Sequence, residues 1–359
     1  MSQISADSKL SSLAGLAANS AWFALLAAAV CAVVVAPSAC HGEDNSKSLS
    51  VMTWNLEWFY DEMSGDNHSQ LGRQKSAPNR DAWDWKRDAV AQRIAQANPT
   101  IAAFQEVENR RVLWYLAQAL KREFSVDYRE SCVEGNDYFT EQDVGILYRN
   151  PADLLSQTQR DRSESQLRDK RFYDVTKHLI AVFQFPIGDR FERVSVVNVH
   201  LRSRPEGAPI RARQARLLHA WLHDSIERGE NVIVLGDFNS EEPADRLSGD
   251  SELAIVAGSE TASTQDDLID LHRYLDHRVT GTHSIPGKHF DRILVSRSLI
   301  EDDPNHKDLV FQSIKVRADL NIQGTPDDPQ RHWDHYWDIA EDERDVSDHL
   351  PVIATFEVK

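Results

Sequence analysis

Cysteine is scarce in this chain, which contains only Cys31, Cys40 and Cys132 among its 359 residues. So few thiols exclude both a disulfide framework and a cysteine-based zinc site, since each needs several cysteines at suitable spacing. A single bridge between Cys40 and Cys132 remains open if Cys40 is retained in the mature protein. We also identify no multi-histidine ligand spacing, which argues against a structural zinc ion. We therefore expect the hydrophobic core to supply most of the stability of the fold.

An excess of positive charge is also lacking. The chain has 40 Lys and Arg against 57 Asp and Glu, which gives a formal net charge of −17. Proteins that hold nucleic acid mainly by neutralising its phosphates usually carry a basic excess. A polyanionic substrate would therefore have to meet a local basic patch or bound cations. The hydrophobic share of 41% and the charged share of 27% are typical of a soluble globular protein with a sizeable core.

One nearly unbroken apolar run covers residues 21–35, between a polar lead that contains Lys9 and the small residues at 36–40. The run is short for a membrane-spanning helix and is typical of a secretory signal. We predict that residues 1–40 are a cleaved signal peptide. An uncleaved N-terminal membrane anchor and lipidation of Cys40 are the alternatives, although Pro37 is unusual in a lipoprotein signal. We expect an exported protein, periplasmic or extracellular, that contacts membrane only through this segment.

Residues 48–359 are predicted to form one domain after a linker at residues 41–47. Short apolar strands alternate with helical patterns, which favours a mixed α/β (α+β) fold with helices covering the sheet faces. The predicted strands are residues 48–54, 101–104, 144–148, 178–185, 194–201, 232–235, 292–295 and 351–358. The predicted helices are residues 86–97, residues 212–226 and one that follows a cap at Asn109. Two polar stretches, 61–84 and 301–345, are interpreted as long loops.

Polar side chains follow the ends of these strands. Carboxylates and amides in such places are natural ligands for a hard cation such as Mg²⁺, and histidines transfer protons near neutral pH. Taken alone, each residue is more typical of turn chemistry, a structural hydrogen bond or a surface charge. The residues concerned are Asn55, Glu57, Glu106, Asn198, His200, Asp237, Asn239, Asp291, Asp348 and His349.

The order of these motifs is more specific than any one of them. In chain order they read VMTWNLE (51–57), QEV (105–107), NVHL (198–201), GDFNS (236–240), DRI (291–293) and SDHLP (347–351). This series closely resembles the ordered motif set of the DNase I-like (endonuclease/exonuclease/phosphatase) superfamily, over residues 48–359. The resemblance implies a four-layer α/β/β/α sandwich, in which two sheets face each other between outer helices. It also implies a metal site at one end of the sandwich.

The resemblance assigns metal ligands to three residues. Glu106 would be the principal ligand of Mg²⁺ or Mn²⁺, with Asn55 nearby. Asp348 would complete the metal or histidine network. Glu57 receives no defined role, and packing or support of Asn55 are equally open.

The resemblance assigns catalysis to five further residues. Asp237 and Asn239 would orient the attacking water or hold the phosphate. His349, oriented by Asp291, would contact the scissile phosphate or act as the base. His200 would be a phosphate contact or a general acid. The choice between Asp237 and His349 as the base stays open.

Basic residues gather directly after His200. Arg202 and Arg204 lie nearest to it and are predicted to contact substrate phosphates. A solvated helix face with internal charge pairs is the alternative for this group, whose other members are Arg211, Arg213 and Arg216. Many family members carry an arginine before the strand that starts here near residue 178, and Lys177, Arg171 or neither takes its place.

We predict an exported nuclease that cleaves DNA or RNA with Mg²⁺ or Mn²⁺, with nucleic acid as substrate and no stable protein partner. A sphingomyelinase or an inositol-phosphate phosphatase of the same superfamily are alternatives, as is a catalytically inactive binding module. The complete set of motif residues argues against the inactive module. The aromatic residues Trp333, Tyr336 and Trp337 would stack bases or touch lipid, although covering the sandwich is the simpler role.

Overall fold

The protein is described by a computed structural model that covers residues 47–359, except 241–248, 250 and 280. The predicted signal or anchor at residues 1–40, including Cys40, lies outside the described residues, as does all of the predicted linker except Lys47. The described residues form one compact unit. Within the described part of the chain, no helix combines the length and the apolar character needed to cross a membrane.

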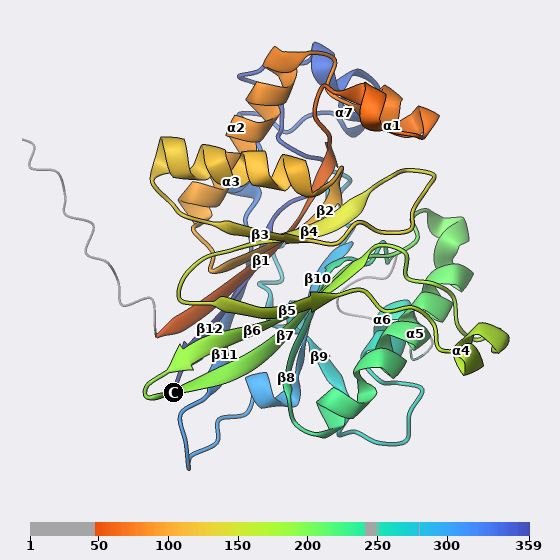
Figure 1. Ribbon diagram of the computed structural model, residues 1–359, viewed down its shortest axis with the longest axis vertical. Coiled ribbons are helices and arrows are strands. Elements are labelled where there is room, and N and C mark those ends of the chain that lie inside the picture. The colour runs from red at the N-terminus through yellow and green to blue at the C-terminus, as the bar shows by residue number, and fades with distance from the viewer. Residues whose placement is uncertain (1–46, 241–248, 250, 280) are drawn as a thin grey trace, which may run out of the picture. The chain divides into compact units, whose positions relative to one another are not determined.

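Two six-stranded sheets form the centre of the domain (Figure 1). Sheet A contains, in spatial order, β11 (Leu309–Val316), β12 (Val352–Val358), β1 (Ser48–Phe59), β2 (Ile101–Val107), β4 (Asp143–Tyr148) and β3 (Arg129–Cys132). Sheet B contains, in spatial order, β5 (Asp153–Thr158), β6 (His178–Ile187), β7 (Arg190–His200), β8 (Asn231–Asp237), β10 (Asp291–Ser296) and β9 (Leu268–Asp270).

Helices cover the outer faces of both sheets (Figure 1). α2 (Arg80–Ala97) and α3 (Arg110–Phe124) pack on sheet A, and α5 (Ala208–Glu227) and α6 (Glu252–Val256) pack on sheet B. The other α-helices are α1 (Gln70–Lys75), α4 (Glu164–Arg168) and α7 (Pro329–His335). The predicted four-layer α/β/β/α sandwich is therefore confirmed.

Alternation along the central strands explains the layers, because successive strand residues point to opposite faces. In β1, Leu49 and Val51 face the core between the sheets, whereas Met52 and Trp54 face α2 and α3. Both faces are apolar, so the central strands read as continuous hydrophobic runs. On the helix side, a fully buried leucine such as Leu116 contributes about 1.5–3 kcal/mol relative to an exposed one.

Helix boundaries follow side-chain caps. The Asn109 side chain accepts hydrogen bonds from the amides of Arg111 and Val112 (2.8 and 3.2 Å), as the predicted cap requires. α2 begins at Arg80, earlier than the predicted residue 86, because Asn79 caps it through the amide of Ala82 at 2.9 Å. The sequence pattern missed this first turn because it is rich in charged and aromatic residues.

The interpretation of residues 61–84 and 301–345 as loops is wrong in part. The first stretch contains α1 and the start of α2, and the second contains β11 and α7. The four strands that the sequence did not predict are β3, β5, β9 and β11, which are the four sheet edges. An edge strand has one unpaired side and often an exposed face, so it lacks the hydrophobic run that marks a central strand.

Candidate active site

The predicted site residues meet at one end of the sandwich because of strand direction. β1 runs parallel to β2, and β7 runs parallel to β8, so each pair ends at the same edge of its sheet. β10 and β12 run antiparallel to these strands and begin at that edge. A hydrogen bond from Asn55 Nδ2 to Asp237 Oδ2 (3.0 Å) joins the two sheets there.

The core between the sheets becomes polar as it approaches this end. Thr53, Gln105 and Asn198 occupy inward-facing positions and are fully buried. Gln105 Nε2 donates to Asn198 Oδ1 (2.6 Å), and Asn198 Nδ2 donates to the carbonyls of Phe104 and Gly145 (2.9 and 3.0 Å). These contacts tie β7 of sheet B to β2 and β4 of sheet A. They form a rigid floor beneath the site, because buried polar groups must keep their partners.

Sheet B places three site residues side by side by regular pairing. Asp237 lies opposite His200 in the parallel ladder and opposite Asp291 in the antiparallel one. Gly236, just before Asp237, has φ +138°, and a Cβ there would lie 2.0 Å from the carbonyl oxygen of Val199. Only glycine permits this close approach of β7 and β8.

His349 is held by a carboxylate on one side and faces the site on the other. Its Nδ1 lies 2.8 Å from Asp291 Oδ2, and its carbonyl accepts a hydrogen bond from Trp54 Nε1 at 3.0 Å. Nε2 lies 3.8 Å from Asp237 Oδ2. Burial opposes protonation of His349, but the facing carboxylates, foremost Asp291, raise its pKa well above the ordinary value. The facing carboxylates thus favour the protonated ring, and Nε2 is the ring nitrogen on the side of Asp237 and Asp348.

His200 has the opposite character. Its Nε2 lies 3.5 Å from Asp237 Oδ2 and 4.0 Å from Glu106 Oε1. Burial, together with the positive charge of Lys177, lowers the pKa of His200 well below its ordinary value. Burial also raises the pKa of Asp237, despite the attraction of His349. The pKa values of the two histidines are therefore shifted in opposite directions, around a carboxylate whose own pKa is raised.

An oxygen-rich group lies beside these residues. Glu106 Oε1 accepts from Asn55 Nδ2 at 3.2 Å, and Asp348 Oδ1 lies 3.8 Å from His349 Nε2. Burial and the negative charge of Asp348 raise the pKa of Glu106 to about 7. Among the described residues, none donates a hydrogen bond to the buried Asp348 Oδ1. Desolvated carboxylates that repel one another, with a carboxylate oxygen left over, fit a hard divalent cation such as Mg²⁺ or Mn²⁺.

Backbone bends bring the oxygen-rich group into place. Four residues have positive φ values, which residues other than glycine rarely adopt: Glu57 (47°), Trp58 (50°), Glu106 (59°) and Asn239 (50°). The first three lie where the pairing of β1 and β2 shifts register. Each such residue costs about 1–3 kcal/mol, a cost that is typical of functional sites.

The structure adds residues that the sequence did not assign. Glu57 Oε2 accepts from the amide of Asp348 (3.1 Å) and lies 2.6 Å from His332 Nε2. His332 Nδ1 lies 2.8 Å from Asp327 Oδ2. Burial opposes protonation of His332, but Glu57 and Asp327 raise its pKa to about 9. His332 and Asp327 belong to the stretch interpreted as a loop, and no local motif marks them.

His283 and Lys177 also reach the site. His283 Nε2 lies 3.5 Å from Asp348 Oδ2, and its backbone forms a bridge with His349. Lys177 Nζ lies 3.0 Å from Asp137, and the Lys177 carbonyl accepts from the amide of His200 at 3.0 Å. Of the two candidates for the missing arginine, Lys177 is beside the site, whereas Arg171 is exposed and pairs with Asp169.

Three of the five arginines after His200 make contacts within the fold, and for Arg211 and Arg216 these are the charge pairs given above as the alternative. Arg211 is fully buried against Glu252 (2.5 Å), and Arg216 pairs with Glu260 (2.7 Å). Arg213 donates to the carbonyl of Phe172 at 2.9 Å. These three side chains bind groups within the fold, because the face of helix α5 that carries them packs against neighbouring segments of the chain. Arg202 and Arg204 follow His200 directly and are exposed.

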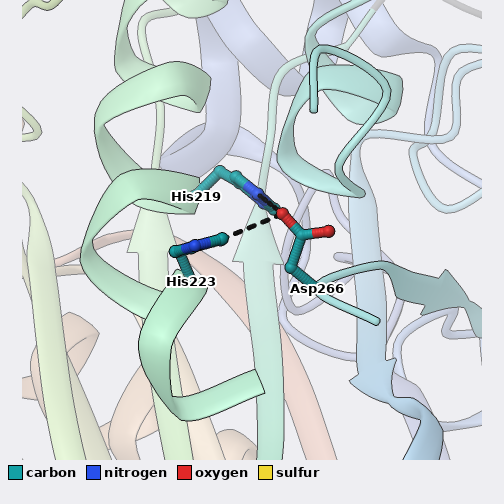
Figure 2. A group of neighbouring side chains, drawn as sticks. All are labelled: His219, His223 and Asp266. Atoms are coloured by element: carbon teal, nitrogen blue, oxygen red, sulfur yellow. Dashed lines mark hydrogen bonds and ion pairs between the residues drawn. The ribbon is translucent and has the colours of Figure 1, made fainter. Parts of the chain in front are cut away.

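One histidine spacing was overlooked in the sequence. His219 and His223 lie four residues apart on α5 and face Asp266, as Figure 2 shows. The expectation that the chain has no multi-histidine spacing is therefore wrong. The group joins α5 to the segment before β9, and it shares no residue with the site described above.

Comparison with known proteins places the fold. The profile of the Endonuclease/Exonuclease/phosphatase family matches residues 52–349. No curated protein sequence matches the chain. A family protein of Bacteroides thetaiotaomicron superposes with a TM-score of 0.54 at 17% identity, covering 86% of this chain and 97% of its own.

Two further solved structures share the fold. TDP2 of D. rerio, solved with a single-strand DNA product, gives a TM-score of 0.51 at 15% identity, covering 86% of this chain and 99% of that one. The human Nocturnin catalytic domain, solved with a bound sulfate, gives 0.51 at 14% identity, covering 87% and 94%.

Proposed function

Because this chain belongs to the endonuclease/exonuclease/phosphatase family, we propose that it is a divalent-metal-dependent phosphodiesterase that acts on nucleic acid. Members of the family are generally hydrolases of phosphate esters. The observation that carries the proposal is the position of Asp237. Its Oδ2 lies within 4 Å of both histidines and accepts from Asn55, beside the oxygen-rich group of Glu106 and Asp348.

The directions of the pKa shifts support a division of the roles that the motifs left open. Asp237 is a carboxylate of raised pKa, so it accepts the proton of the attacking water. Asn239 orients the Asp237 carboxylate, since the backbone N–H of Asn239 donates to Asp237 Oδ1 at 2.8 Å. His349, whose pKa the facing carboxylates raise, would donate from Nε2 to a phosphoryl oxygen and offset charge that develops there. As the bond from the water oxygen to phosphorus forms, the bond from phosphorus to the leaving oxygen breaks, and the leaving oxygen keeps the electron pair and takes up a proton from solvent.

Glu106, Asp348 and Asn55 are the residues that would hold Mg²⁺ or Mn²⁺. The bound cation supplies Lewis acidity to a phosphoryl oxygen. His200 Nε2 lies 3.5 Å from Asp237 Oδ2 and 4.0 Å from Glu106 Oε1, where it would contact the phosphate.

Aromatic and cationic groups beside the site support a nucleic acid substrate. A cavity of about 320 Å³ is lined by Glu57, Trp58, Lys75 and Trp333, among others. Lys75 Nζ lies 4.4 Å from the Trp333 ring centre and 5.6 Å from that of Trp58. Trp333 is 51% exposed, so its ring is available to stack on a base. TDP2 of D. rerio, which shares the fold, was solved with single-strand DNA.

One observation favours a phospholipid as the second candidate substrate. Tyr138 and Phe139 are adjacent and 82% and 74% exposed, in the segment between β3 and β4. Asp137, just before them, pairs with Lys177 at the site. Two exposed aromatic side chains near a phosphodiesterase site would suit contact with a membrane surface.

The test measures hydrolysis of plasmid DNA, RNA, sphingomyelin and an inositol polyphosphate, each with Mg²⁺, with Mn²⁺ and with EDTA. The variant His349→Ala is the inactive control, and Arg171→Ala is a matched change of an exposed residue outside the site. We expect metal-dependent cleavage of DNA or RNA that His349→Ala lacks and Arg171→Ala keeps. Turnover confined to lipid would overturn the proposal that nucleic acid is the substrate. Full activity in EDTA would overturn the proposed requirement for a divalent metal.

A paired variant, Arg202→Ala with Arg204→Ala, tests the local basic patch. Two exposed phosphate contacts account for about two units of the slope of log affinity against log salt. We expect binding of DNA to weaken and its salt dependence to become shallower, with kcat little changed. We also propose that residues 1–40 direct export, which N-terminal sequencing of the protein recovered from the producing cell's exterior or periplasm would test.

A further inference from the structure

A second group of metal-ligand type lies on α5, apart from the residues assigned to phosphodiester cleavage. It consists of His219, His223 and Asp266, whose possible ligand atoms all lie within 4.8 Å of one another (Figure 2). His219 Nε2 lies 3.2 Å and His223 Nδ1 lies 3.0 Å from the same oxygen, Asp266 Oδ2. Spacing of i and i+4 sets the two rings on one helix face, as in helical zinc motifs.

Proton positions in this group are constrained by the backbone. His219 Nδ1 lies 3.0 Å from the carbonyl oxygen of Val256, which can only accept, so Nδ1 carries the proton. In a neutral ring, Nε2 then presents a lone pair to Asp266 Oδ2, which is also an acceptor. Two acceptors at 3.2 Å repel each other unless a second ring proton or a cation lies between them.

The distances suit a cation. Tetrahedral zinc with bonds of roughly 2.0–2.1 Å separates its ligand atoms by about 3.3 Å. The two nitrogen-to-oxygen distances, 3.2 and 3.0 Å, are close to this value. The nitrogens of His219 and His223 need only a modest approach, which His223 can supply because its side chain is 37% exposed.

Outer partners complete the pattern expected around metal-binding histidines, whose second nitrogen usually donates to a carbonyl or carboxylate. Val256 serves His219 in this way, and Glu227 Oε2 lies 3.7 Å from His223 Nε2. Thr261 Oγ1 donates to Asp266 Oδ1 at 3.1 Å, which leaves Oδ2 for the cation. The Asp266 side chain is fully buried, and a charge so placed is normally paired or bound to metal.

We infer that His219 Nε2, His223 Nδ1 and Asp266 Oδ2 bind a divalent transition metal of the Zn²⁺ type. Two imidazoles favour such an ion over Mg²⁺ or Ca²⁺, which prefer oxygen ligands. The ion fastens the segment that links α6 to β9 onto α5. Water takes the fourth position on the exposed side, next to His223. This inference is independent of the proposed function.

The test compares zinc binding by the chelator-stripped protein and two variants, by equilibrium dialysis and elemental analysis with excess Mg²⁺ present. His223→Gln removes a ligand. His306→Gln is the matched control, because His306 Nδ1 lies 2.9 Å from Asp303 in an exposed pair without a second histidine. The phosphodiesterase site is present in all three proteins, so its own zinc binding cancels.

We expect His223→Gln to bind one equivalent less zinc, or to bind it more than about 100-fold more weakly, since even outer partners contribute 10–100-fold. Zinc should raise the Tm of the unaltered protein and of His306→Gln more than that of His223→Gln. Equal binding and equal Tm shifts in all three would overturn the inference. A cobalt spectrum of the unaltered protein without a tetrahedral band would also overturn it, whether or not the variant folds.

Discussion

Sheet B places His200, Asp237 and Asp291 by regular strand pairing, whereas sheet A places Glu106 and Glu57 through bent backbone. His200, Asp237 and Asp291 lie opposite one another in continuous ladders. Glu106 and Glu57, in contrast, have positive φ at a register shift between β1 and β2. Regular pairing holds the groups that move protons at fixed separation. The bent strands β1 and β2 bring together carboxylates that repel one another. The sheet A half of the site therefore depends on a bound cation and on contacts from surrounding residues.

The largest effect is expected in the sheet B half. Asp237→Asn keeps the shape of the side chain but removes the proton acceptor, so kcat should fall by about 10³-fold at saturating metal. Added Mg²⁺ should not restore it. Steady-state kinetics check this, with Asp169→Asn as a control on a carboxylate outside the site. A folded Asp237→Asn protein with kcat within tenfold of the original would show that another group is the base.

A change in the sheet A half should instead alter the metal requirement. Glu106→Gln removes one ligand charge, so the Mg²⁺ concentration for half-maximal activity should rise by about 100-fold. Part of the lost activity should return at high Mg²⁺, unlike in Asp237→Asn. Metal titrations of both variants make the comparison. If the two respond alike to added metal, the division between the sheets is wrong.

The contact of His332 with Glu57, which supports the bent strand β1, should stabilise the protein in a pH-dependent way. The pKa of His332 is raised to about 9 in the folded protein, from about 6.5 when unfolded. The His332–Glu57 pair therefore stabilises fully below pH 6.5, and this contribution is lost as pH rises through 9. It amounts to roughly 3 kcal/mol. The difference in Tm between the original protein and His332→Gln should shrink from pH 6 to pH 9.5. A constant difference would indicate a packing role alone.

The floor that joins the two sheets should contribute to stability and little to chemistry. Asn198→Ala leaves the carbonyls of Phe104 and Gly145 without their donor, which should lower the free energy of unfolding by about 2 kcal/mol. Denaturant unfolding measures this. At a temperature where the variant is folded, kcat should stay within tenfold. A variant as stable as the original would show that the floor is not a link between the sheets.

The sequence by itself determined the central strands, the three long helices and the order of the site residues. Apolar runs mark buried strands, and Asn109 caps α3 through local backbone amides, so neighbouring residues carry that information. Polar residues such as Asn55 and Asp237 follow directly on those runs. Their common location then follows from strand direction alone.

Only the tertiary structure decided which charges serve the site. Arg211 and Arg202 are alike in sequence, yet the first is buried against Glu252 and the second is exposed. His332 reaches Glu57 across 275 positions of the chain. The four edge strands were also decided by tertiary structure. Each pairs with a neighbouring strand on one side only, and it lacks the hydrophobic run by which a central strand is predicted from sequence. Pairing and burial depend on distant segments, and no local pattern records which segments will meet.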